Sequence, residues 1–202
     1  MNFNLGTSMP VGLGQLRKVG SPLYSHSSGL GERPRRPVNS NLRQHNNTPH
    51  MSPLFKKLNL GAQSVIHVIN APESFETELA ALKGVTIKRS VSGRCGFAMA
   101  FVITQTELDV ASAKLAKACE GDAVLWMVYP KGTSKKYKCE FNRDSGWPTL
   151  GAAGFEPVRM VAVDADWSAL RFRKVQHIKT MARKVGGAIS EAGKRKASAN
   201  DA

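Results

Sequence analysis

Cysteine, acidic residues and long apolar runs are scarce in this sequence, and each scarcity excludes a class of protein. The three cysteines among 202 residues form no C-x-x-C pair, which excludes a disulfide framework and a cysteine-rich zinc site. This usage predicts free thiols, a cytoplasmic location and no bound metal. No apolar stretch approaches the roughly 20 residues that span a bilayer, so no membrane partner is expected.

The shortage of acids leaves the chain strongly basic, with a formal net charge of +14. Residues 1–50 and 174–202 together hold thirteen of the 29 basic residues but three of the 15 acidic ones. The excess charge therefore lies mainly at the two ends, and the central part is mildly basic. Basic ends attract any polyanion without defining a folded site, so weak nucleic-acid association through them is one hypothesis.

Residues 1–50 lack the apolar periodicity of a folded element, and the segment Arg33–Pro37 is incompatible with regular helix or interior strand. Three explanations fit this stretch: a disordered basic extension, a transit peptide, or an untranslated extension upstream of a true start at Met51. The third is favoured, because the stretch carries no pattern of its own.

Strand and helix patterns alternate from residue 60 onward, which predicts an α/β domain over residues 51–174. We expect a three-layer, Rossmann-like, mostly parallel sheet that ends in an antiparallel hairpin around Asp164-Ala165-Asp166. The spatial order should be second, first, third, fourth, sixth and fifth strand. The expected strands are 64–70, 85–91, 97–104, 123–129, 158–163 and 167–174. The expected helices are 72–82 and 107–120, with a shorter helix near 145–153.

The turn after the first strand contains no glycine, which argues against a dinucleotide or S-adenosylmethionine there. Its sequence is Asn70-Ala71-Pro72-Glu73, and Asn70 with Glu73 predicts a capping box for the following helix. Thr104 and Glu107 repeat the pattern after the third strand. Both turns therefore indicate stable helix caps, and no cofactor is expected.

Basic and aromatic side chains gather instead around the end of the fourth strand and the final hairpin. Lys131 opens a loop rich in lysine and hydroxyl groups, which suits phosphate binding, although a solvated lysine loop is the commoner interpretation of such a sequence. On the last strand, the period of two places Trp167, Arg171 and Arg173 on one face. That face could clamp an anionic planar ligand, or Arg171 could pair with Asp144 or Asp164, and the pairing is slightly favoured. The candidate ligand-binding residues, expected at one end of the sheet, are Lys131, Arg143, Asp144, Trp167, Arg171 and Arg173.

These same residues carry a resemblance to a bacterial family of small Rossmann-like domains of unknown function. Asn70-Ala71-Pro72, Trp126–Lys131 (WxxYPK), Arg143–Trp147 (RDxxW) and Asp164–Arg173 (DxxWSALRFR) match the motifs of that family. The resemblance covers residues 58–175 and brings no established activity with it. It implies a strand order like that of class I methyltransferases from which the cofactor loop has been lost.

The leading hypothesis is a binding domain without catalytic activity that takes an anionic ligand or partner at the strand carboxyl ends, because no serine has a histidine partner or a nucleophile elbow. One alternative is a divergent methyl- or nucleotidyl-group transferase that uses the same crevice. Another is a nucleic-acid-associated protein that acts through its tails. In the basic tail, residues 175–202, we expect a helix over about Gln176–Val185 and disorder from about Glu191.

Overall fold

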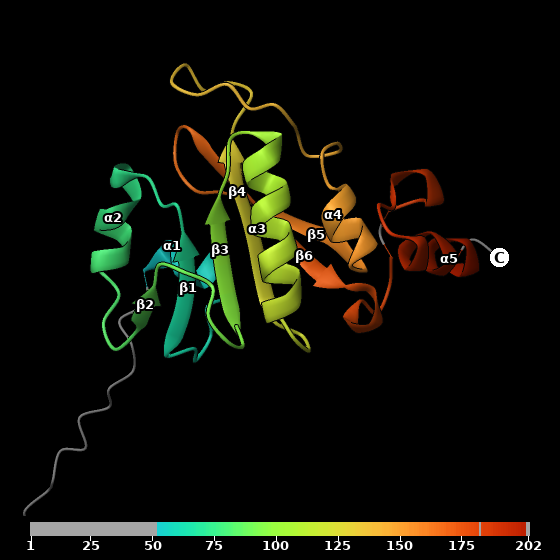
Figure 1. Cartoon of the computed structure of the whole chain (residues 1–202), viewed down its shortest axis with the longest axis horizontal. Helices are drawn as coiled ribbons and strands as arrows, with labels where there is room; N and C mark the ends of the chain where they lie inside the picture. The colour runs from blue at the N-terminus through green and yellow to red at the C-terminus, as the bar shows by residue number, and fades with distance from the viewer. Residues whose placement is uncertain (1–51, 182, 201–202) are drawn as a thin grey trace, which may run out of the picture. The chain divides into compact units, whose positions relative to one another are not determined.

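Six strands form one sheet in the computed structural model of the protein, which describes residues 52–181 and 183–200 (Figure 1). Their order is β2-β1-β3-β4-β6-β5, in which the first four strands are parallel and β6 runs antiparallel to both neighbours. The predicted order and the C-terminal antiparallel hairpin are confirmed, and the fold is α/β and Rossmann-like. The strands are β1 (Val65–Ile69), β2 (Thr86–Lys88), β3 (Phe97–Phe101), β4 (Val124–Pro130), β5 (Phe155–Ala162) and β6 (Trp167–Lys174).

The central strands are buried on both faces, as the continuous apolar run of β3 predicts. All five residues of β3 are buried, and six of the seven in β4 are. At the far side of the sheet, β5 is an edge strand with one neighbour, and its register with β6 shifts between Pro157 and Arg159. A proline and a bulge are common protections for an exposed strand edge.

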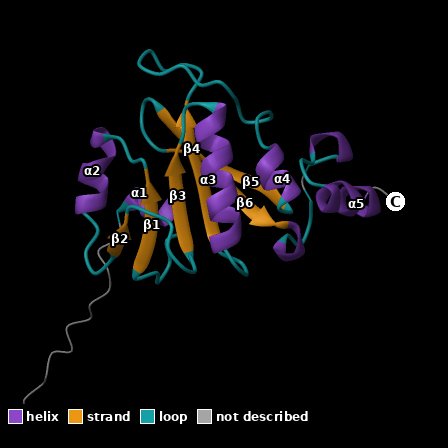
Figure 2. Ribbon diagram, viewed as in Figure 1, coloured by secondary structure: helices purple, strands orange, loops and turns teal. Residues whose placement is uncertain are grey.

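Helices cover the two faces of the sheet and form three layers. Helix α1 (Pro53–Lys57) and helix α2 (Glu73–Ala80) pack on one face, while α3 (Gln105–Ala118) and α4 (Pro148–Ala152) pack on the other. In Figure 2, α3 runs along the front of the sheet. Helix α1 was not expected from the sequence; Ser52 caps it, and Trp126 Nε1 donates a hydrogen bond to the Leu58 carbonyl that follows it (2.8 Å).

One of the two predicted capping boxes forms. The Thr104 hydroxyl accepts from the Glu107 N–H (3.2 Å), and the Glu107 carboxylate accepts from the N–H groups of Ile103 and Thr104. These backbone hydrogen bonds hold the pKa of Glu107 below its usual range. The corresponding box at Asn70 and Glu73 is absent, because Asn70 adopts a left-handed conformation (φ 53°) and the N-cap position falls on Pro72.

The prediction for the C-terminal tail was wrong. Instead of a helix over Gln176–Val185, the chain makes two short 3-10 turns, Val175–His177 and Val185–Gly187. Helix α5 (Glu191–Asn200) then occupies the part expected to be disordered. Contacts with the domain override the local helical spacing, since β5 holds the residues just before α5, as described below.

No helix in residues 52–181 or 183–200 has the length and apolarity that crossing a membrane requires. The three cysteines are free thiols. The explanations offered for residues 1–50 concern a stretch outside the described residues.

Replacing Thr104 by alanine removes the acceptor at the start of α3, and we expect the free energy of unfolding to fall by about 1 kcal/mol. Urea denaturation measures this change. Thr106→Ala, at an exposed position in the same helical turn, is the matched control and should change stability far less. Equal losses in the two variants would contradict a capping role for Thr104.

Candidate functional site

Lys131 forms hydrogen bonds that connect the loop after β4 to the final hairpin. Its N–H donates to the Asp166 carbonyl (2.7 Å), and its Nζ donates to the Asp164 carbonyl. The Ser134 hydroxyl adds a hydrogen bond to Asp166 Oδ1 (2.8 Å). The ammonium group therefore lies at the sheet's carboxyl edge, as the sequence predicts, but it already has a partner there.

Trp167 offers no stacking surface to a ligand. Its side chain is buried, with 3% of the residue exposed, because Phe101 and Tyr137 pack on it with ring centroids 5.2 and 4.9 Å away. Asp164 fixes its backbone by accepting from the Trp167 N–H (2.7 Å). The tryptophan thus belongs to the hydrophobic core, and a clamp built on its ring is excluded.

Arg171 and Arg173 lie toward the opposite end of the sheet from Lys131, because β6 runs antiparallel to β4. Arg173 pairs with Asp122 in the loop before β4 at 2.5 Å, and this hydrogen bond lowers the pKa of Asp122. Arg171 forms neither of the expected pairs with Asp144 or Asp164. Its Nε is buried without a partner among the described residues, and burial lowers the pKa of its guanidinium group. The expected gathering of all the candidate residues at one end of the sheet was therefore wrong.

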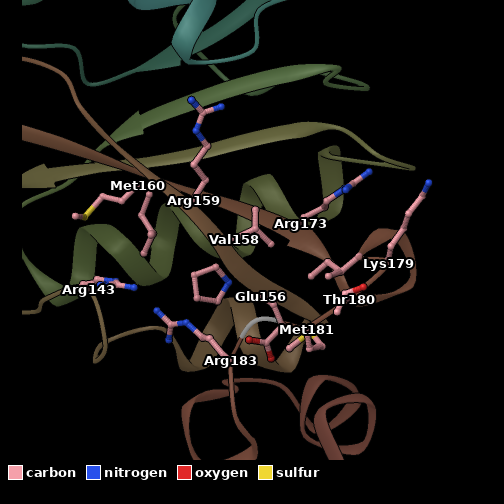
Figure 3. A pocket seen from close by; sticks show the side chains of 13 residues that line it. Arg143, Glu156, Val158, Arg159, Met160, Arg173, Lys179, Thr180, Met181 and Arg183 are labelled. Atoms are coloured by element: carbon pink, nitrogen blue, oxygen red, sulfur yellow. The ribbon is translucent and has the colours of Figure 1, made fainter. Parts of the chain in front are cut away.

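A hollow of about 540 Å³ lies between edge strand β5 and the tail residues 178–181 and Arg183, and we call it the basic hollow (Figure 3). Two of the predicted residues, Arg143 and Arg173, line it. In Figure 3 Arg143 lies close to Arg183, while Arg173 and Lys179 lie toward the other side of the view. The charged and polar lining comes from Arg143, Glu156, Arg159, Arg173, Lys179, Thr180 and Arg183.

The single carboxylate in this lining is already engaged. Glu156 is buried, and its Oε1 accepts hydrogen bonds from the N–H groups of Ile189 (3.0 Å) and Ser190 (2.7 Å) and from the Ser190 hydroxyl (2.7 Å). Ser190 in turn accepts from the Gly193 N–H at the start of α5 (2.9 Å). The carboxylate thus anchors the tail, and five basic side chains, of which Arg173 already pairs with Asp122, line the rest of the hollow.

Two of these basic groups approach one carboxylate at the rim. Asp144 Oδ1 lies 3.2 Å from Arg183 Nη2 and 4.0 Å from Arg143 Nε. The Asp144 side chain is 71% exposed, whereas that of Arg183 is largely buried and also donates to the Gly187 carbonyl (3.0 Å). Two guanidinium groups thus approach one carboxylate oxygen, an arrangement in which arginines commonly bind anions, and the carboxylate is that of an exposed surface residue.

The hollow continues toward the carboxyl end of β4. A neighbouring depression of about 940 Å³ shares Arg143 and Met160 with it and includes Lys131 and Lys138. A separate crevice of about 270 Å³ lies where Ile69 and Asn70 at the end of β1 face the first turns of α3. This crevice lies at the switch point of the sheet, where open α/β sheets commonly bind ligands.

The cysteine, tyrosine and potential metal-ligating residues of the described chain form no evident reactive centre. No group of three or more histidine, cysteine or acidic residues is placed to hold a metal ion there. Burial raises the pKa of the Cys119 thiol to about 12, and burial likewise raises that of Tyr129 to about 12. Both groups are therefore protonated and weakly nucleophilic at neutral pH.

Sequence reasoning missed Glu156, Arg159, Lys179 and Arg183 as parts of a site. Glu156 was detectable as a lone acid in an otherwise apolar and basic strand, Phe155–Ala162. Lys179 and Arg183 carried no such signal, because in a tail of basic composition each resembles a solvated side chain.

No family model and no curated protein matches the chain. Among solved structures, it is similar to magnesium protoporphyrin IX methyltransferase from Synechocystis PCC 6803 with bound SAH, with 13% identity and a TM-score of 0.40 over 60% of this chain and 78% of that one. It is also similar to the N-methyltransferase NodS from Bradyrhizobium japonicum WM9, with 13% identity and a TM-score of 0.39 over 60% of this chain and 92% of that one. These similarities assign no activity to this chain.

Gly193→Ala tests whether Glu156 holds the tail. A Cβ at this position would lie 2.1 Å from Glu156 Oε1, so α5 should detach, although alanine favours a helix more than glycine does. We expect faster tryptic cleavage after Lys179 and Lys184 and a lower melting temperature. The control is Gly186→Ala, where a Cβ meets nothing within 4 Å. Unchanged cleavage in Gly193→Ala would show that the tail is held by other contacts.

Proposed function

We propose that this domain binds an anionic ligand in the basic hollow. The observation that supports the proposal most is an excess of cations: among the described residues, five basic side chains and one carboxylate line the hollow, and that carboxylate, Glu156, is occupied by Ile189 and Ser190. Arg173 pairs with Asp122 outside the lining, and Arg143 and Arg183 share one exposed carboxylate, that of Asp144, at the rim. A site of this composition attracts anions and holds them by charge-assisted hydrogen bonds. The proposed location is beside β5 rather than at the ends of the parallel strands.

Arg143 and Arg183 are the groups that we expect to contact the anion directly. Both approach Asp144 Oδ1, so an anionic group of the ligand would take the position of that carboxylate. The Asp144 carboxylate can move away from the two arginines into solvent, because most of its side chain is exposed. Surface ion pairs of this kind contribute about 1 kcal/mol or less, so a ligand displaces one at little cost.

The role is binding rather than catalysis, because the lining offers charge and apolar contact but no carboxylate free to act as a base. A general base has to lie within hydrogen-bond distance of the proton that it takes. The carboxylate oxygens of Glu156 instead accept hydrogen bonds from the backbone just before α5.

Inorganic phosphate serves as the probe, and isothermal titration calorimetry measures its affinity. Arg143→Gln and Arg183→Gln should each weaken phosphate binding, since a hydrogen bond to a charged group contributes about 1.5–3 kcal/mol. Arg94→Gln is the matched control, because Arg94 is exposed, pairs with Glu120 and changes the net charge equally. Asp144→Asn should strengthen binding by removing the internal competitor. A similar loss of affinity in all three arginine variants would reduce the effect to overall charge and contradict the proposal.

A second candidate function, a divergent methyl- or nucleotidyl-group transferase, is favoured by the crevice at the end of β1. It lies at the switch point of the sheet and is lined by polar groups, among them Asn70, Thr106 and Glu107. If this candidate is right, S-adenosylmethionine or ATP should raise the melting temperature of the protein, and Ala111→Trp, which fills the crevice, should remove that effect. The absence of any shift with either compound at saturating concentration would exclude it.

A further inference from the structure

Two large apolar side chains lie exposed beside the cations of the basic hollow. Met160 is 50% exposed and Val158 is 41% exposed, although both belong to a strand whose other apolar residues are mostly buried. Leu170 and Ile178, which are buried, lie behind them in the same lining. Neighbouring exposed apolar groups inside a concave site indicate contact with an apolar part of a ligand or partner.

An added β-strand does not suit this position, although β5 is an edge strand. Pro157 supplies no N–H, and the bulge between Pro157 and Arg159 interrupts the regular spacing of the outward-pointing backbone groups. The tail residues 178–181 and Arg183 also border the hollow. A volume of about 540 Å³ falls instead within the range of sites for small molecules.

We propose that the ligand of the basic hollow is a small amphiphilic acid: a carboxylate or phosphate group joined to a short apolar body. This inference rests on the proposed function and specifies its ligand class. The acid group binds Arg143 and Arg183 at the rim, and the apolar body packs on Val158 and Met160. A fully ionic ligand would leave those two side chains in water, and a neutral apolar ligand would leave the arginines uncompensated.

The ligand is a single molecule taken from solution rather than a lipid in a bilayer. The exposed apolar surface consists of two side chains in a recess between β5 and the tail. A bilayer would need a broad apolar face that projects from the protein. The recess instead encloses a body of a few carbon atoms, each of which gains free energy on leaving water.

Octyl phosphate, inorganic phosphate and octanol, each below any aggregation threshold, are the probes in calorimetric titrations of the whole chain. Octyl phosphate should bind at least about tenfold more tightly than phosphate, because burial of methylene groups adds to the same ionic contact. Val158→Ser and Met160→Ser should remove much of this gain and leave phosphate affinity unchanged. Val110→Ser is the matched control, since Val110 is 50% exposed on α3 and lies outside the hollow.

Each other outcome has a definite meaning. Equal affinities for phosphate and octyl phosphate would overturn the amphiphile and leave anion binding intact, whereas no binding of either would overturn both. A gain that persists in Val158→Ser and Met160→Ser would place the octyl chain elsewhere and overturn the inference. Binding to vesicles of anionic phospholipid without binding of monomeric octyl phosphate would also overturn it, in favour of a membrane surface.

Discussion

The C-terminal part of this protein depends on one buried carboxylate. Glu156 accepts hydrogen bonds from the backbone and hydroxyl of Ser190 and from the backbone of Ile189, and no basic side chain among the described residues pairs with it. A buried carboxylate without such donors would be strongly destabilising, so the docked tail stabilises the carboxylate and the carboxylate in turn holds the tail. The close approach of Gly151 and Gly193 to this junction leaves no room for a side chain. Through it the tail forms one wall of the basic hollow.

The sheet was predictable because its information is local. The β-branched and apolar runs of β1, β3 and β4, with helices between them, indicate parallel strands, and the Asp164–Asp166 turn indicates the hairpin. Right-handed crossovers then determine the strand order. Helix α5 could not be predicted this way, because Glu156, which binds the residues just before it, lies more than thirty residues earlier in the chain. The capping box predicted at Asn70 does not form for a local reason, since the left-handed conformation of Asn70 moves the N-cap position to Pro72.

The site was predictable only in part, for a related reason. The sequence indicated that arginines and acids near the hairpin mattered, and Arg143 and Arg173 do line the hollow. Alternation along β6 also separated Trp167 from Leu170, but it could not show that Phe101 and Tyr137 bury the indole ring. Nor could composition reveal which basic residues of the tail face the domain. Arg183 joins the site because the chain turns back across β5, and that path is a tertiary property.

If the hollow binds the proposed ligand, the position of Arg183 couples its occupancy to the folding of the tail. Arg183 is a tail residue, and its guanidinium group reaches Asp144 in the domain while also binding the Gly187 carbonyl. A ligand that bridges Arg143 and Arg183 would join the tail to the domain a second time, beyond the Glu156 junction. By thermodynamic linkage, if the docked tail strengthens ligand binding, the bound ligand stabilises the docked tail against local opening by the same free energy. The protein would therefore exchange its C-terminal amide hydrogens most slowly when the hollow is full, and release of the tail would be a route for release of the ligand.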